Sequence, residues 1–131
     1  MNILKKIIQL FKKGKSISQP DFLFPGLVTV ERYFAFKPKQ RMQAVMIVGD
    51  AADINFYDFL KWCVENDTDL GVRLAALKRL TNFPEQSDLV PFLLKLDQLN
   101  EKRALEPYLS TALLRMGHIT AAEMNSRIDN A

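Results

Sequence analysis

The sequence has few of the residues from which catalytic and metal sites are usually built. Its 131 residues contain one cysteine, Cys63, and one histidine, His118. A single cysteine excludes an internal disulfide and a zinc site made of several thiolates. The glycine-rich phosphate loop and the H-E-x-x-H and G-x-S-x-G patterns are missing as well. The sequence therefore predicts no catalytic residue, no cofactor and no metal ion.

Glycine and long apolar runs are also scarce. Five glycines argue against a loop-rich or barrel design. No run approaches the roughly 18 apolar residues of a membrane span, and no apolar core with a cleavage site marks a secretory signal. A hydrophobic fraction of 48% in a chain of this length is enough for the core of one globular domain. We expect such a domain, in the cytoplasm.

Acidic residues are missing from the first 20 positions. Residues 1–20 carry five lysines and no acid, a net charge of +5, whereas the remainder carries 13 basic and 15 acidic residues, a net charge of −2. The positive charge of the chain is therefore a property of its N-terminal segment. A body close to neutral weakens the case for nucleic-acid binding, which we keep as a second alternative function.

The rest of the chain is rich in helix signals. Asp53 is placed as an N-cap, and Pro91 falls in a first turn, where proline is tolerated. Gly117 can end a helix, and the letters TAAE at 120–123 form a capping box. From apolar residues at helical spacing we predict helices over 39–49, 53–66, 69–83, 87–99 and 106–117, and a short polar helix from 120 onward.

Residues 27–36 are the ambiguous stretch. Val28, Val30, Phe34 and Phe36 alternate as in a strand, and β-branched and aromatic residues favour a strand locally. Several of the same residues also fit one face of a helix. We predict a helix, because the repeat described next requires one here.

The helices repeat with a period in the thirties. Two of them carry an arginine, then an alanine, then a large apolar residue at the same offsets, and a third keeps the last two positions. The corresponding residues, 32 and then 36 positions apart, are Arg41/Arg73, Ala44/Ala76/Ala112 and Val48/Leu80/Met116. This divides the chain into units of about 21–52, 53–84 and 85–118, preceded by a basic helix and linker (1–20) and followed by a capping helix (119–131). Paired helices at such a period are typical of an α-solenoid.

The stretch DTDLGVRLAALKRL, residues 67–80, resembles the second helix of a HEAT repeat. In that family an acid, here Asp67, lies in the turn, and an arginine, here Arg73, follows about six residues later. An arginine fork can reach carboxylates and turn carbonyls of its own and of the adjacent repeat. Only this unit carries the full pattern, because Ala35 replaces the acid in the first unit and Leu109 replaces the arginine in the third.

The resemblance implies an all-α, right-handed α–α superhelix of the armadillo type, with about three helical hairpins. It also implies a scaffold or adaptor without enzymatic activity, which holds a protein partner on the surface of its second helices and takes no small-molecule substrate. The repeat alignment places on that surface Gln43, Met46, Lys78, Asn82 and Thr111.

Residues 2–13 predict an amphipathic helix, with lysines on one side and isoleucine, leucine and phenylalanine on the other. Two interpretations remain open. The helix covers the apolar end of the first repeat, or it docks on an anionic membrane surface or a partner, which makes a peripheral membrane factor the first alternative function. The residues that would make the contact are Lys5, Lys6, Ile7, Phe11, Lys12 and Lys13.

The remaining reactive residues have structural interpretations. We expect Cys63 to be a packed core thiol and His118 to cap a helix end. The pairs Asp50/Asp53 and Asp67/Asp69 flank predicted helix starts, so capping explains them better than acid–base catalysis. We expect most of the dense aromatic residues between 22 and 36 to be core, and some of them are candidates for a partner pocket.

Overall fold

The computed structural model describes residues 29–100 and 103–129, and every regular element in these ranges is helical. The all-α class predicted from the sequence is confirmed. None of the described helices is long and apolar enough to cross a lipid bilayer. The elements are α2 (Val30–Ala35), α3 (Pro38–Ala51), the 3₁₀ turn η1 (Ile54–Phe56), α4 (Tyr57–Asn66), α5 (Leu70–Leu80), α6 (Leu89–Leu99), α7 (Tyr108–Arg115) and α8 (Ala121–Asp129).

Helix α2 resolves the ambiguous stretch in favour of a helix. Thr29 caps it, because its Oγ1 accepts a hydrogen bond from the backbone N–H of Arg32 at 3.1 Å. Tyr33 is fully buried and meets the rings of Phe59 and Trp62 on α4 edge-on. Burial of this aromatic side chain outweighs the local strand propensity.

The predicted helix at 53–66 begins later than expected. Asp53 does act as a cap, but its carboxylate accepts the N–H of Asn55 at 3.0 Å and caps the 3₁₀ turn, after which α4 begins at Tyr57. The predicted helix at 69–83 ends earlier, at Leu80. Residues 81–83 form a turn instead, in which the N–H groups of Asn82 and Phe83 donate to the carbonyls of Arg79 and Leu80, and Phe83 is buried just before Pro84.

The local signals of the three C-terminal helices act as predicted, although α6 begins at Leu89 rather than at 87 and α7 spans Tyr108–Arg115 rather than 106–117. Pro91 lies in the first turn of α6. Gly117 has a φ of +73°, and the N–H groups of Gly117 and His118 donate to the carbonyls of Leu114 and Leu113, both at 2.9 Å, which closes α7. At the start of α8, the Thr120 and Glu123 side chains each accept the other residue's N–H at 3.1 Å, as in a capping box.

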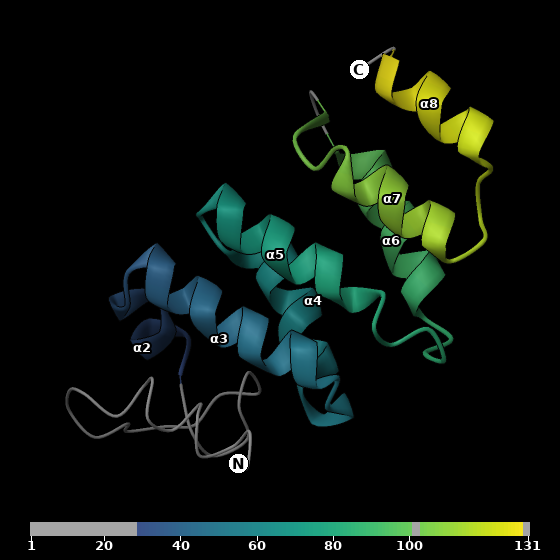
Figure 1. Ribbon diagram of the computed structural model, residues 1–131. Coiled ribbons are helices and arrows are strands. Elements are labelled where there is room, and N and C mark those ends of the chain that lie inside the picture. Colours follow the sequence, from purple (N-terminus) through teal and green to yellow (C-terminus); the bar gives the residue numbers. More distant parts are fainter. Residues whose placement is uncertain (1–28, 101–102, 130–131) are drawn as a thin grey trace.

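Figure 1 shows α3, α5 and α7 side by side in a front layer and running in the same direction, with α4 and α6 behind them. Helix α5 is central, because it packs against α3, α4 and α7, and α7 in turn contacts α6 and α8. The repeated alanines Ala44, Ala76 and Ala112 are all buried in one continuous core. Small side chains at these positions let neighbouring helices approach closely.

Candidate partner-binding face

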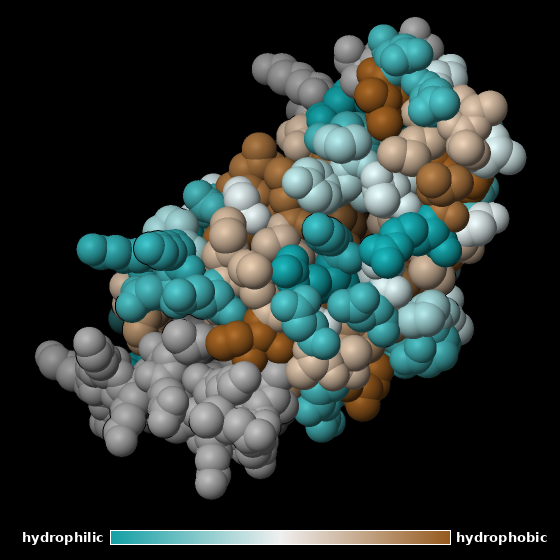
Figure 2. Space-filling model, in the orientation of Figure 1, coloured by the Kyte–Doolittle hydropathy of each residue, from teal (hydrophilic) through white to brown (hydrophobic). Residues whose placement is uncertain are grey.

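The candidate site is the solvent-facing side of α3, α5 and α7, which we call the front face (Figure 2). The sequence placed five residues there. Gln43, Met46, Lys78 and Asn82 are exposed and Thr111 is half-buried. Met46 is 39% exposed although its side chain is apolar. Exposed methionines of this kind are common on surfaces that bind protein partners.

The structure brings only two of these five residues together. Lys78 and Thr111 line one groove between α5 and α7. Gln43 and Met46 belong to α3 and do not line that groove. The amide of Asn82 donates to the Gly49 carbonyl at 2.9 Å, so it ties the end of α5 to the end of α3. Asn82 thus holds the front layer together as well as facing solvent.

The groove between α5 and α7 has a volume of about 300 Å³. The cations Lys78 and Arg115 line it together with two threonines, Tyr108 and an apolar floor, and none of its lining residues is acidic. Arg115 donates to the Thr81 hydroxyl at 3.2 Å across the groove. Hydrophilic side chains gather over the carboxyl ends of α5 and α7 in Figure 2.

A buried ion pair lies behind the front face and joins the first two predicted units. The Arg41 guanidinium donates to the Asp67 carboxylate at 2.9 and 3.1 Å, and to the Phe36 carbonyl at 2.5 Å. Tyr33 Oη also donates to Asp67, at 2.6 Å. Burial alone would lower the pKa of Arg41, but the hydrogen bond and charge of Asp67 outweigh it, so that the pKa is raised and the ion pair persists.

Arg73 does not pair with Asp67, although the sequence pattern relates them. Its Nε donates to the Val64 carbonyl in the last turn of α4, at 2.6 Å, and it forms no ion pair within the described residues. The Asp67 carboxylate instead binds Arg41, which belongs to the preceding predicted unit. The pattern therefore identified both residues but not which arginine binds the acid.

A second, more exposed contact joins α3 and α5. Arg79 Nε donates to the Asp50 carboxylate at 3.0 Å, and the aliphatic part of Arg79 lies against Gly49. A Cβ atom at position 49 would lie 2.4 Å from Arg79 Cδ, so only glycine leaves room for this approach. The capping interpretation is thus correct for Asp53 and Asp69 and wrong for Asp50, whose carboxylate binds an arginine. Asp67 does both, because its carboxylate accepts the N–H of Asp69 at 2.8 Å as well as hydrogen bonds from Arg41.

Asp88 makes a similar link to the third predicted unit. Its carboxylate accepts a hydrogen bond from Tyr57 Oη at 2.9 Å and from Lys61 Nζ at 2.6 Å, both on α4. The hydrogen bond from Lys61 is the main cause of a lowered pKa of Asp88. No local pattern predicts this contact, because Asp88 is in its own segment only a residue before a helix.

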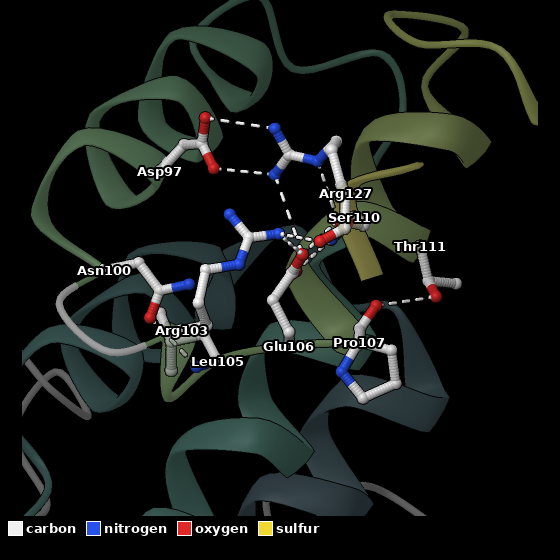
Figure 3. A network of polar contacts seen from close by, with 9 residues as sticks. All are labelled: Asp97, Asn100, Arg103, Leu105, Glu106, Pro107, Ser110, Thr111 and Arg127. Atoms are coloured by element: carbon white, nitrogen blue, oxygen red, sulfur yellow. Dashed lines mark hydrogen bonds and ion pairs between the residues drawn. The ribbon is translucent and has the colours of Figure 1, made fainter. Parts of the chain in front are cut away.

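A polar network that sequence reasoning missed attaches α8 (Figure 3). Arg127 binds the Asp97 carboxylate of α6 at 2.6 and 3.3 Å and the Ser110 hydroxyl of α7 at 2.8 Å. Glu106, whose side chain is 6% exposed, accepts from Arg103 at 2.6 Å and from Ser110. Because α8 contains no buried residue, these polar contacts are its principal attachment.

A second hollow, of about 350 Å³, lies between α4, α5 and the end of α6. Its walls include Leu96, the 64% exposed Leu99, and the opposite charges of Glu65 and Arg73. Its lining carries one charge of each sign and therefore no excess of one charge.

The candidate reactive groups are placed as structural residues. Cys63 is fully buried 3.4 Å from Tyr33 Oη, and burial raises the pKa of its thiol, which disfavours the reactive thiolate. His118 is exposed, and its backbone N–H closes α7 as expected. Across residues 29–100 and 103–129, no group of three His, Cys, Asp or Glu side chains is arranged to hold a metal ion.

The contact residues predicted for the N-terminal helix, Lys5 to Lys13, and the aromatic residues Phe22 and Phe24 lie outside the described residues. Among the aromatic residues of the stretch 22–36 that the structure describes, Tyr33 is part of the core, and Phe34 and Phe36 are half-buried and pack against that core.

Comparisons with known proteins add no relative: no protein-family model, curated protein or solved structure matches this chain.

Proposed function

We propose that this protein is a small HEAT-like scaffold without enzymatic activity, which binds a protein partner on its front face. In this proposal the helix pairs are repeats of a right-handed superhelix. The observation that carries it is the parallel front layer of α3, α5 and α7, in which equivalent alanines are buried while Gln43, Met46 and Lys78 are exposed. Arg41 and Asp67, the repeat residues, support it by joining consecutive units.

The chemistry of the described residues supports a binding role. The one thiol is inaccessible and has a raised pKa, and the one imidazole stands in solvent beyond a helix end. Neither has the nucleophile–base geometry that covalent catalysis requires. A rigid layer of helices with exposed side chains is instead the usual basis of recognition by stacked helical repeats.

Site-specific photo-crosslinking tests the proposal. Gln43 on α3 and Gln98 on α6 are both exposed glutamines, but they belong to the front and back layers. A photoreactive amino acid at Gln43 should give a discrete adduct in cells that express the protein, and the same residue at Gln98 should not. Equal adducts from both positions, or none from Gln43, would show that the front face is not the binding surface.

A second candidate function rests on the one-sided lysines of residues 1–15, which suit docking on an anionic bilayer. Vesicle flotation with and without phosphatidylserine tests it. Binding should require the anionic lipid and should disappear when residues 1–15 are deleted. Flotation that is unaffected by this deletion contradicts it.

A further inference from the structure

The groove between α5 and α7 is the place where the described surface leaves two cations without a counter-charge. Half of the basic side chains of the described residues lie within ion-pair distance of a carboxylate: Arg41, Lys61, Arg79, Lys95, Arg103 and Arg127. Lys78 and Arg115 do not, and they line the same groove. Lys37, Lys39 and Arg73 also lack such a partner, but none of them lines this groove.

The charged groups of the groove, on Lys78 and Arg115, only donate hydrogen bonds. The Thr111 hydroxyl donates to the Pro107 carbonyl at 2.8 Å, and the Thr81 hydroxyl donates to the Lys78 carbonyl at 3.0 Å, so both hydroxyl protons are already used. The remaining donors are the Lys78 ammonium, the other N–H groups of Arg115 and the Tyr108 hydroxyl. A site of this kind complements a carboxylate, which only accepts hydrogen bonds.

We propose that this groove binds an acidic peptide segment of the partner, with carboxylates on Lys78 and Arg115 and an apolar side chain on Tyr108. This inference rests on the proposed function and specifies the partner's chemistry. Tyr108 is 38% exposed, and its ring beside two cations suits a segment in which acidic and apolar residues alternate.

The charge of the described residues favours a short acidic segment over a nucleic acid. The described residues hold 12 basic and 13 acidic side chains, a net charge of 12 − 13 = −1. A nucleic acid gains affinity by placing many phosphates on basic residues, and two cations on a body of net charge −1 supply few such contacts. A short acidic segment can bind through the two cations of the groove alone.

Fluorescence anisotropy with two labelled peptides tests the proposal. One peptide alternates glutamate with leucine, and the other replaces each glutamate with glutamine. The full-length protein should bind the glutamate peptide more tightly, and raised salt should weaken that binding. The double variant Lys78→Gln/Arg115→Gln should lose about tenfold in affinity, whereas Lys95→Gln, on α6, should not change it. Circular dichroism of each variant checks that the helices persist.

Several results would overturn the proposal. Equal affinity for the two peptides, or no binding of either at millimolar concentration, excludes an acidic occupant. Tighter binding of a single-stranded oligonucleotide that the double variant loses assigns the groove to nucleic acid instead. Crosslinks from Gln43 that persist in the double variant, together with equal peptide affinities, leave the proposed function intact and reject only the acidic segment. Equal crosslinks from Gln43 and Gln98 reject the proposed function itself.

Discussion

Replacing Asp67 with alanine would leave the Arg41 guanidinium buried without its counter-charge. The two side chains are 0% and 5% exposed, so water cannot take the place of the lost carboxylate. Asp67 also accepts hydrogen bonds from Tyr33 Oη at 2.6 Å and from the N–H of Asp69 at 2.8 Å. Removing one partner of a buried ion pair costs about 3–5 kcal/mol, a large share of the roughly 5–15 kcal/mol by which a domain is stable.

Urea unfolding followed by circular dichroism at pH 7 measures this loss. With a denaturant slope of about 2 kcal/mol per M, a loss near 4 kcal/mol lowers the midpoint by roughly 2 M. The matched control is Asp50→Ala, which breaks the exposed contact of Asp50 on α3 with Arg79 on α5. The Asp50 side chain is 66% exposed, so this change should cost no more than about 1 kcal/mol.

The double variant Arg41→Met/Asp67→Leu distinguishes the loss of the ion pair from the cost of leaving one charge buried alone. Because it removes both charges, it should be more stable than Asp67→Ala alone, although the Tyr33 hydroxyl loses its acceptor. A loss below about 1 kcal/mol for Asp67→Ala, or a loss equal to that of Asp50→Ala, would refute the view that this ion pair joins the first two units.

Three further predictions concern other contacts. Gly49→Ala should destabilise the protein by about 1–3 kcal/mol in urea unfolding, although alanine favours helices, because the new Cβ would lie 2.4 Å from Arg79 Cδ; unchanged or raised stability would show that Arg79 moves aside at little cost. Burial raises the pKa of the Cys63 thiol, so the folded protein keeps this proton more tightly than the unfolded chain does. The resulting contribution to the free energy of unfolding is complete below the ordinary thiol pKa of about 8.5, and it is lost as the pH rises above that value, by up to about 1.4 kcal/mol per pH unit. Cys63→Val should flatten the fall in stability between about pH 8.5 and 10, and an equally steep fall in this variant would assign that loss to other groups. Arg127→Ala should speed amide hydrogen exchange in α8 and leave α5 unchanged, because the contact with Asp97 is a principal attachment of α8; exchange as slow as in the wild type would mean that other contacts hold this helix.

The sequence by itself determined the helices and many of their ends. Asp69 before α5, Gly117 after α7 and the capping box at Thr120 act within a few residues of their own position. Such signals depend on local backbone geometry, so a single sequence displays them. The repeat spacing also aligned Ala44 with Ala76, and both are buried in the structure.

Only the tertiary structure decided which distant residues meet. Arg41 rather than Arg73 binds Asp67, and Arg127 reaches Asp97 across 30 positions. These pairings depend on the rotation and offset of each helix against its neighbours. The chain does not encode either quantity locally, because side chains of many residues fix them together. The groove that joins Lys78 to Arg115 exists for the same reason, since the space between two packed helices belongs to neither sequence segment alone.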